Sequence, residues 1–302
     1  MRNWRFLTAQ QIVRGDWMML PEHAINSGEQ LDLLLNPNQD FAALSQSIIE
    51  LNGPLPQTFA SVNEGEGDGY SDMPEGSIAT FKITGTYLKH DTMCSYGNET
   101  VGNAMVAAAN NKNIAGCLFH TDSGGGAVNA IAPILEGIQA FKSAGKPVLG
   151  LADAAYSAAY YAISACDYIM ADNNLSAGFG SIGVMATLVD IRGKIEKEGG
   201  KIHTIYAPES EEKNKAFELA LEGKYELIQQ EHLSPLAVAF QNAVKTNRSG
   251  KLKLDEGNLV LKGKTYNAQQ SLSMGLIDAI GNRQKAIEHL FDMVQTFKFL
   301  NS

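Results

Sequence analysis

The feature that most constrains the fold is a regular alternation of short apolar segments and helical segments between residues 77 and 172. Helical spacing of apolar residues occurs over 99–113 and 127–145, whereas 77–88, 114–122, 148–153 and 168–172 have the length and character of strands. Strands that alternate with helices over short connections pair in parallel, with right-handed crossovers. The sequence therefore predicts an α/β fold in which a core of parallel strands and helices forms layers.

The chain after residue 190 predicts a more varied structure. Residues 191–208 have the pattern of a helix followed by a strand, and 211–245 have that of a long polar helix. A basic, hairpin-like piece over 249–267 and a helical segment over 267–296 complete the chain.

A linker precedes the regular region. Residues 62–77 are acidic, rich in glycine and without periodicity, which is the composition of a loop or linker. We therefore divide the chain into an N-terminal appendage (1–61), this linker (62–77) and a main domain (78–296).

Charge and cysteine content exclude several classes of function. The net charge of −9 argues against broad nucleic-acid binding and against anionic membrane surfaces. The three cysteines are odd in number and have neither disulfide-framework nor zinc-site spacing, so we expect a reducing compartment and no metal site. Cys117 and Cys166 lie in apolar runs and are predicted core residues. Cys94 does not lie in such a run. Neither a secretory signal nor a run of 18 apolar residues is present, which favours a soluble, cytoplasmic protein without a membrane anchor.

Two glycine-rich turns are candidates for binding a ligand. Residues 120–128 (HTDSGGGAV) lie between a predicted strand and a predicted helix, and 178–184 (GFGSIGV) follow a strand. Glycine lets the backbone approach a ligand closely, and free amides at a helix start favour a phosphate or a developing oxyanion. Nucleotide binding is the weaker option, because GxGxxG spacing and a P-loop lysine are missing. Each turn taken alone is equally consistent with a tight turn that has no function.

Between these turns, Ser157 is a candidate nucleophile. The preceding strand ends near Ala152, so the serine falls in the first turn of a helix rich in alanine. There it meets orphan amide donors and the positive end of the helix dipole. Most serines in such positions have only a packing or capping role, so the chemistry depends on a base.

The sequence leaves the identity of that base open. None of the six histidines lies in a motif that ties it to Ser157, although a Ser-His-Asp triad is joined only in space. A lysine can serve if burial lowers its pKa from about 10.4 toward neutrality. Lys213 and Lys215 are candidates, but neighbouring acidic residues are equally typical of a solvated helix face.

Four sequence blocks in order resemble the signal peptide peptidase A family of serine–lysine peptidases, which includes the head maturation proteases of tailed phages. The blocks are 122–126 (DSGGG), 155–161 (AYSAAYY), 180–184 (GSIGV) and 200–205 (GKIHTI), the last leading to Lys213. The resemblance covers residues 78 to 295 and implies the fold shared by the Clp protease subunit and the crotonases. Residues 273–278 (SMGLID) also resemble the closing turn of the family.

The resemblance implies a role for eight residues. Ser157 resembles the nucleophile, and Lys213 the base with Lys215 as the alternative, while Ser181 matches a serine that helps to hold the lysine. Gly125 matches the glycine whose amide lines the oxyanion hole. The remaining oxyanion and substrate-binding positions are Gly126, Ala158 and Gly183. No metal or cofactor is implied.

Two departures from the family pattern affect the oxyanion region. Gly124 replaces the family proline, and Ala158 and Ala159 replace two glycines after the nucleophile. The methyl groups of Ala158 and Ala159, which glycine lacks, are expected to narrow the access of a substrate to the oxyanion region.

The resemblance suggests two settings for a peptidase. One is a phage or prophage head protease that cuts scaffold and capsid proteins inside an assembling shell, and the other is a cytoplasmic peptidase that degrades signal-peptide remnants. Family members form rings, so a homo-oligomer is expected. Two rival functions remain: a crotonase-type enzyme that acts on acyl-CoA thioesters, and a catalytically inactive shell protein.

Overall fold

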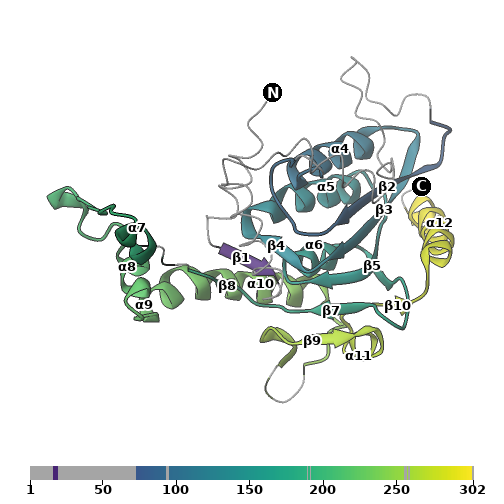
Figure 1. Cartoon of the computed structure of the whole chain (residues 1–302). Helices are drawn as coiled ribbons and strands as arrows, with labels where there is room; N and C mark the ends of the chain where they lie inside the picture. Colours follow the sequence, from purple (N-terminus) through teal and green to yellow (C-terminus); the bar gives the residue numbers. More distant parts are fainter. Residues whose placement is uncertain are drawn as a thin grey trace.

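The computed structural model describes residues 16–19, 73–92, 95–188, 190, 192–254, 257 and 259–300 (Figure 1). Most of the predicted appendage and linker, and also Cys94, lie outside these residues, so the division into domains stays a prediction. Within the described part of the chain, no helix is both long and apolar enough to cross a membrane.

A mostly parallel sheet forms the centre of the molecule. Its strands are β2 (Ser77–Thr84), β3 (Ile114–Ser123), β5 (Val148–Tyr156), β6 (Tyr168–Ala171) and β10 (Ala279–Ile280), in the order β10-β6-β5-β3-β2. These neighbours all pair in parallel. The short strand β7 (Gly178–Gly180) pairs in parallel with the end of β5, and β9 (Thr265–Asn267) pairs antiparallel with β7. The predicted layered α/β core is confirmed.

Helices cover both faces of this sheet. On one face lie α4 (Asn98–Asn110), α5 (Ile131–Ser143, after the 3-10 turn η1, Val128–Ala130) and α6 (Ala158–Ser164), and on the other lies α12 (Arg283–Leu300) (Figure 1). Successive strand residues point to opposite faces, so Phe119 joins the core under α4 and α5 while Leu118 packs with Leu290 of α12. Cys117 and Cys166 are buried, as predicted, and burial raises the pKa of both thiols.

The region after residue 190 projects away from the core as an arm (Figure 1). It contains α7 (Arg192–Lys197), the 3-10 turn η2 (Pro208–Ser210), α8 (Lys215–Leu221), α9 (Glu226–Ile228), the π-helical turn η3 (Gln229–Leu233) and α10 (Ser234–Asn247), which returns to the core. Two predictions are wrong here. Residues 201–207 form no strand, and the single helix expected over 211–245 is divided by a turn at Gly223.

Two further predictions fail because the pairing partners are distant in sequence. The hairpin expected over 249–267 is absent from the described residues of that segment, which contain the turn η4 (Leu259–Leu261) and β9. The partner of β9 is β7, some 85 residues upstream. The helical segment expected over 267–296 is α11 (Ala268–Ser273) and α12, separated by Gly275 in a left-handed conformation (φ 74°) and by β10.

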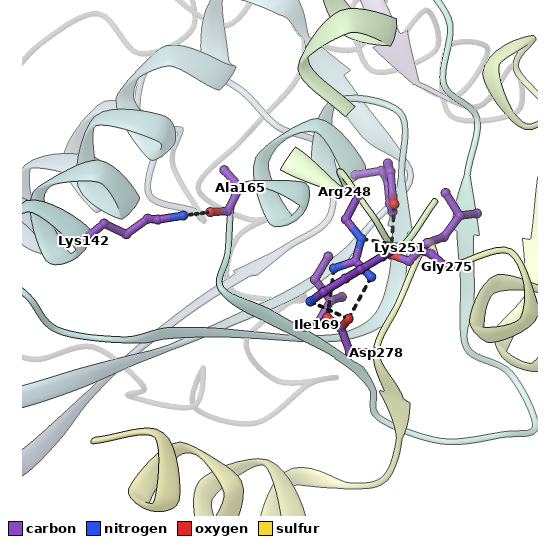
Figure 2. Close-up of polar contacts among 9 residues, drawn as sticks. Lys142, Ala165, Ile169, Arg248, Lys251, Gly275 and Asp278 are labelled. Atoms are coloured by element: carbon purple, nitrogen blue, oxygen red, sulfur yellow. Dashed lines mark hydrogen bonds and ion pairs between the residues drawn. The ribbon is translucent and has the colours of Figure 1, made fainter. Parts of the chain in front are cut away.

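A buried ion pair attaches the arm to the sheet (Figure 2). Arg248, which follows α10, is 1% exposed and donates two hydrogen bonds, of 2.8 and 3.0 Å, to the Asp278 carboxylate. Asp278 also accepts from the Ile169 amide (2.8 Å) and pairs with Lys251 (2.8 Å). Burial alone would raise the pKa of Asp278, but the hydrogen bonds from Arg248 and Lys251 lower it overall. The base of the arm is therefore fixed to β6 and to the turn before β10.

Candidate active site

Ser157 occupies a strained turn between β5 and α6. Its φ is 53° and its ψ is −118°, a left-handed conformation that is uncommon for a residue with a Cβ atom. Such strain persists only where the surrounding structure imposes it, and it is typical of functional sites. A sharp strand-to-helix turn with a serine at its tip is also the geometry of the nucleophile elbow in hydrolases.

The end of β5 explains this conformation. Tyr156 pairs with Gly180 of β7, and the Ser157 amide donates to the Gly180 carbonyl (2.9 Å). The Ser157 carbonyl then accepts from the Tyr161 amide (2.9 Å), which is the first hydrogen bond of α6. The amide of Ser157 thus bonds to β7 and its carbonyl bonds within α6, and these two hydrogen bonds fix its backbone conformation.

The Ser157 side chain points toward the loop that leads to β8 (Met185–Ala186). Its hydroxyl donates a long hydrogen bond (3.3 Å) to the Gly183 carbonyl, and the residue is 1% exposed. Among the described residues, no lysine, histidine or carboxylate hydrogen-bonds to this hydroxyl. The structure therefore brings Gly183 to the candidate nucleophile, whereas the described residues of one chain bring no base to it.

The glycine turn after β3 lies beside this site, because Ser123 pairs with Ala155 near the end of β5. Gly125 has φ 107°, and its amide donates to the Ser123 hydroxyl (3.0 Å). The Gly125 amide assigned to the oxyanion hole by resemblance is thus already bonded within the turn. A short strand, β4 (Gly125–Ala127), begins at this residue.

The amide and carbonyl of Gly126 point away from Tyr87, whereas groups of Gly125 and Ala127 bond to it. Tyr87 donates to the Gly125 carbonyl and accepts from the Ala127 amide, both at 2.9 Å. Alternate residues of a strand direct their hydrogen-bonding groups to opposite edges, so the Gly126 amide faces away from Tyr87. A Cβ atom at Gly126 would collide with the Tyr87 backbone, which explains the glycine. Gly126 is therefore a better candidate than Gly125 for an oxyanion donor.

Ala158 supplies a second candidate donor. It is the first residue of α6 and is buried, and the first amides of a helix have no acceptor within the helix. An amide directly after a nucleophilic serine is suitably placed for an oxyanion.

Ser181 repeats the unusual conformation of Ser157. Its φ is also 53°, and its amide donates to the Lys264 carbonyl (2.9 Å). The neighbouring Gly263 lies 3.5 Å from where a Cβ atom of Gly183 would be. The segment just before β9 therefore supports the loop that contacts the Ser157 hydroxyl, a contribution that the sequence did not reveal.

The two candidate lysines lie on the arm, away from Ser157. Lys213 is exposed, and Lys215 is 49% exposed and pairs with Glu212 (2.8 Å) at the start of α8. Figure 1 shows α8 in the projecting arm, whereas β5 and α6 lie in the core. The hydrogen bond that Lys215 donates to the Glu212 carboxylate raises the pKa of Lys215, which is the opposite of what a general base requires. One chain alone thus does not assemble the serine–lysine pair.

Other titratable groups in the described part of the chain do not complete the site. His120 lies within β3, where burial and the charge of Lys82 lower its pKa. Its charged neighbours include Asp172 and Arg283, which begins α12, so it belongs to the opposite face of the sheet from α6. No cluster of three potential metal ligands occurs among the described residues.

A second, three-stranded sheet lies across this region, in the order β4-β1-β8. Its central strand β1 (Asp16–Met19) comes from the predicted appendage and pairs antiparallel with both neighbours. It also contacts α6. A four-residue segment with one acidic and three apolar residues is too weak a signal to have predicted this strand.

A cavity of about 500 Å³ adjoins the far end of β8. The residues that line it come from the loop 186–190 and from the arm, and most of them are apolar, among them Ala186, Leu188, Leu221 and Ile228. It lies where a chain paired with β8 would continue away from Ser157.

Comparisons with known proteins agree with the geometry. Residues 140–296, just over half of the chain, match the sequence profile of Peptidase family S49. The chain is 24% identical over 220 residues to Protease 4 of Haemophilus influenzae, covering 72% of this chain and 35% of that one. It spans between 35% and 56% of the length of the curated relatives it matches.

Solved structures with a related arrangement include two kinds of enzyme. A mutant of the 1510-N membrane-bound stomatin-specific protease gives a TM-score of 0.43 at 13% identity, covering 72% of this chain and 86% of that one. An enoyl-CoA hydratase from Shewanella pealeana gives 0.39 at 14% identity, covering 76% and 78%.

The match to the family profile includes Ser157, Ser181 and both candidate lysines, and it extends through the arm to α12. The resemblance first inferred from four short sequence blocks is confirmed by it. The chain belongs to Peptidase family S49.

Proposed function

We propose that this protein is a serine peptidase in which Ser157 attacks the carbonyl carbon of a peptide bond. The observation that carries the proposal is the left-handed conformation of Ser157 at the β5–α6 junction, with its hydroxyl beside Gly183. Backbone strain of this kind clusters at active sites, where it can hold a reacting group in position. Family membership supports the same reaction class.

In this mechanism, a neutral lysine takes the Ser157 proton as the oxygen forms its bond to the carbonyl carbon. The resulting oxyanion accepts hydrogen bonds from the Gly126 and Ala158 amides. Collapse of the tetrahedral intermediate breaks the C–N bond, and the departing amine takes the proton from the lysine. Water then attacks the acyl-enzyme ester, again with the lysine as base; the C–O bond to Ser157 breaks, the carboxylic acid leaves, and the lysine returns the proton to the Ser157 oxygen. Each oxyanion donor contributes roughly 10²- to 10³-fold to kcat in comparable sites.

The base is proposed to come from a second copy of the chain. Lys213 is exposed on an arm that projects from the core, and Ser157 has no base among the described residues of its own chain. A homo-oligomer in which the arm of one copy reaches the site of the next would bury the lysine and lower its pKa. Lys213 is preferred, because Lys215 is already paired with Glu212.

The proposed substrates are extended segments of proteins. The resemblance to head maturation proteases favours capsid and scaffold proteins of a phage or prophage, with signal-peptide remnants in the cytoplasm as the alternative. The cavity beside β8, whose lining includes Leu188, Leu221 and Ile228, suits an apolar side chain a few residues before the scissile bond.

Labelling with a fluorophosphonate probe, together with cleavage of casein, tests the proposal. We expect the wild type to carry the probe on Ser157 and to cleave the substrate, and Ser157→Ala to do neither. Ser143→Ala at the end of α5 is the matched control and is expected to behave like the wild type. Cleavage that persists in Ser157→Ala contradicts the proposal. Binding of an acyl-CoA thioester without labelling indicates a crotonase-type enzyme instead.

A further inference from the structure

The strand β1 fills a position between two edges that belong to the candidate site. Trp17, Met18 and Met19 pair with Ala127, Gly126 and Gly125 of β4. On the other side, Asp16 and Trp17 pair with Ala186 and Met185 of β8. One short segment from the start of the chain thus joins β4 to β8.

The register brings the end of β1 to the nucleophile. Met19 lies opposite Gly125 on β4, and continuing the β8 register by two residues puts it opposite Gly183. Gly183 accepts the hydrogen bond from the Ser157 hydroxyl, and Gly125 begins the strand that contains the candidate oxyanion donor. A chain in this position therefore runs past Ser157. With β1 in place, Ser157 is only 1% exposed.

The pairing also uses the candidate oxyanion donor. The Gly126 amide faces away from Tyr87, and the residue opposite it on that side is Met18. A peptide substrate would need the same backbone groups of β4 and β8, because extended peptides bind by adding a strand to a free edge. β4 and β8 each lie one strand spacing from β1, so the space between them holds only one strand at a time.

We propose that residues 16–19 form an internal pseudosubstrate strand, which occupies the peptide groove of Ser157 and must leave before a substrate binds. This inference rests on the proposed peptidase function. The strand marks the direction of a bound peptide as well: its residues run from Ala127 toward Gly125, and the bond that is cut follows the residue opposite Gly126, whose carbonyl oxygen faces the candidate oxyanion donor. The enzyme is therefore autoinhibited while the strand is in place, and competing peptides or cleavage after Met18 relieve the inhibition.

Proline substitution in the full-length chain tests the strand. Met18→Pro removes the amide that faces Gly126, whereas Met18→Val keeps the amide and a side chain suited to a strand. We expect the fluorophosphonate probe to label Ser157 about tenfold faster in Met18→Pro than in Met18→Val, with a lower KM for peptide and little change in kcat. If Met18→Pro does not fold, Trp17→Pro, with Trp17→Phe as its control, weakens the pairing to β8 instead.

A binding experiment separates this inference from the proposed function. In the Ser157→Ala background, a fluorescent peptide with the sequence of residues 14–21 is expected to bind the Met18→Pro chain about tenfold more tightly than the Met18→Val chain. Equal binding and equal labelling of the two variants overturn the pseudosubstrate, even when the protein is an active peptidase. Tighter binding to Met18→Pro without labelling or cleavage in any variant supports the occupied groove and contradicts the peptidase. Cleavage after Met18 in the wild type, absent from Ser157→Ala, supports both.

Discussion

The Ser157 hydroxyl donates to the Gly183 carbonyl over 3.3 Å, which joins the tip of the β5–α6 turn to the loop before β8. This contact holds the candidate nucleophile beside the loop before β8, and β1 lies between β8 and β4. It is long for an O–H···O hydrogen bond, so the hydroxyl can leave it at little energetic cost when a base arrives.

The strain at Ser157 predicts a stability difference between two inactive variants. Glycine adopts a positive φ freely, so Ser157→Gly should be more stable than Ser157→Ala by about 1–2 kcal/mol. Urea unfolding of both variants measures this. The control pair Gln139→Gly and Gln139→Ala, at an exposed position inside α5, should give the opposite order, because glycine lowers helix stability by roughly 0.5–1 kcal/mol relative to alanine. Equal stabilities of the two Ser157 variants would show that the turn is not strained.

A shared active site predicts complementation between two inactive chains. Lys213→Ala and Ser157→Ala should each be inactive alone, and a mixture refolded together should recover roughly a quarter of the wild-type activity, since random assembly pairs an intact serine with an intact lysine that often. Cleavage assays of the mixed and separate proteins measure this. Lys197→Ala, exposed on the same arm, is the control and should stay active. A mixture that stays inactive would argue that the base is in the same chain or is not Lys213.

Gly126→Ala tests the oxyanion assignment. The added Cβ atom would meet the Tyr87 backbone, so β4 must shift and move the Gly126 amide out of position. We expect kcat to fall by about 100-fold or more. Comparison of kcat and KM with the wild type measures the effect, and circular dichroism checks the fold. Gly193→Ala, where a Cβ atom meets nothing within 4 Å, should leave both parameters unchanged. A Gly126→Ala enzyme with normal kcat would exclude this amide from the oxyanion hole.

The Arg248–Asp278 pair predicts a pH-dependent stability. Asp278→Asn leaves a buried guanidinium without its counter-charge and should lower the free energy of unfolding at pH 7 by about 3–5 kcal/mol. The pKa of Asp278 is lowered in the folded protein, so its contribution is complete above the ordinary carboxyl pKa and disappears as the pH falls through the folded value.

Unfolding of the wild type and of Asp278→Asn from pH 7 to pH 2 tests this, and the difference between them should shrink only below about pH 4. Asp292→Asn, on the exposed face of α12, is the control and should change little at any pH. A constant difference down to pH 2 would contradict the role of the charge.

Local patterns predicted most of the core. The strands and helices between 77 and 171 follow from apolar spacing, because each element buries one side against its neighbours in sequence. The same reasoning failed in the arm. Residues 201–207 resemble a strand, but a strand needs an edge to pair with, and the arm offers none there.

The sequence by itself determined the order of the core elements, the position of Ser157 after a strand and the membership of Peptidase family S49. Only the tertiary structure decided which amide of the glycine turn faces β1, where the lysines lie, and that residues 16–19 pair beside residues more than 100 positions away. The physical reason is that spacing along the chain records which side of an element is buried, whereas pairing between distant strand edges uses backbone groups that every residue carries.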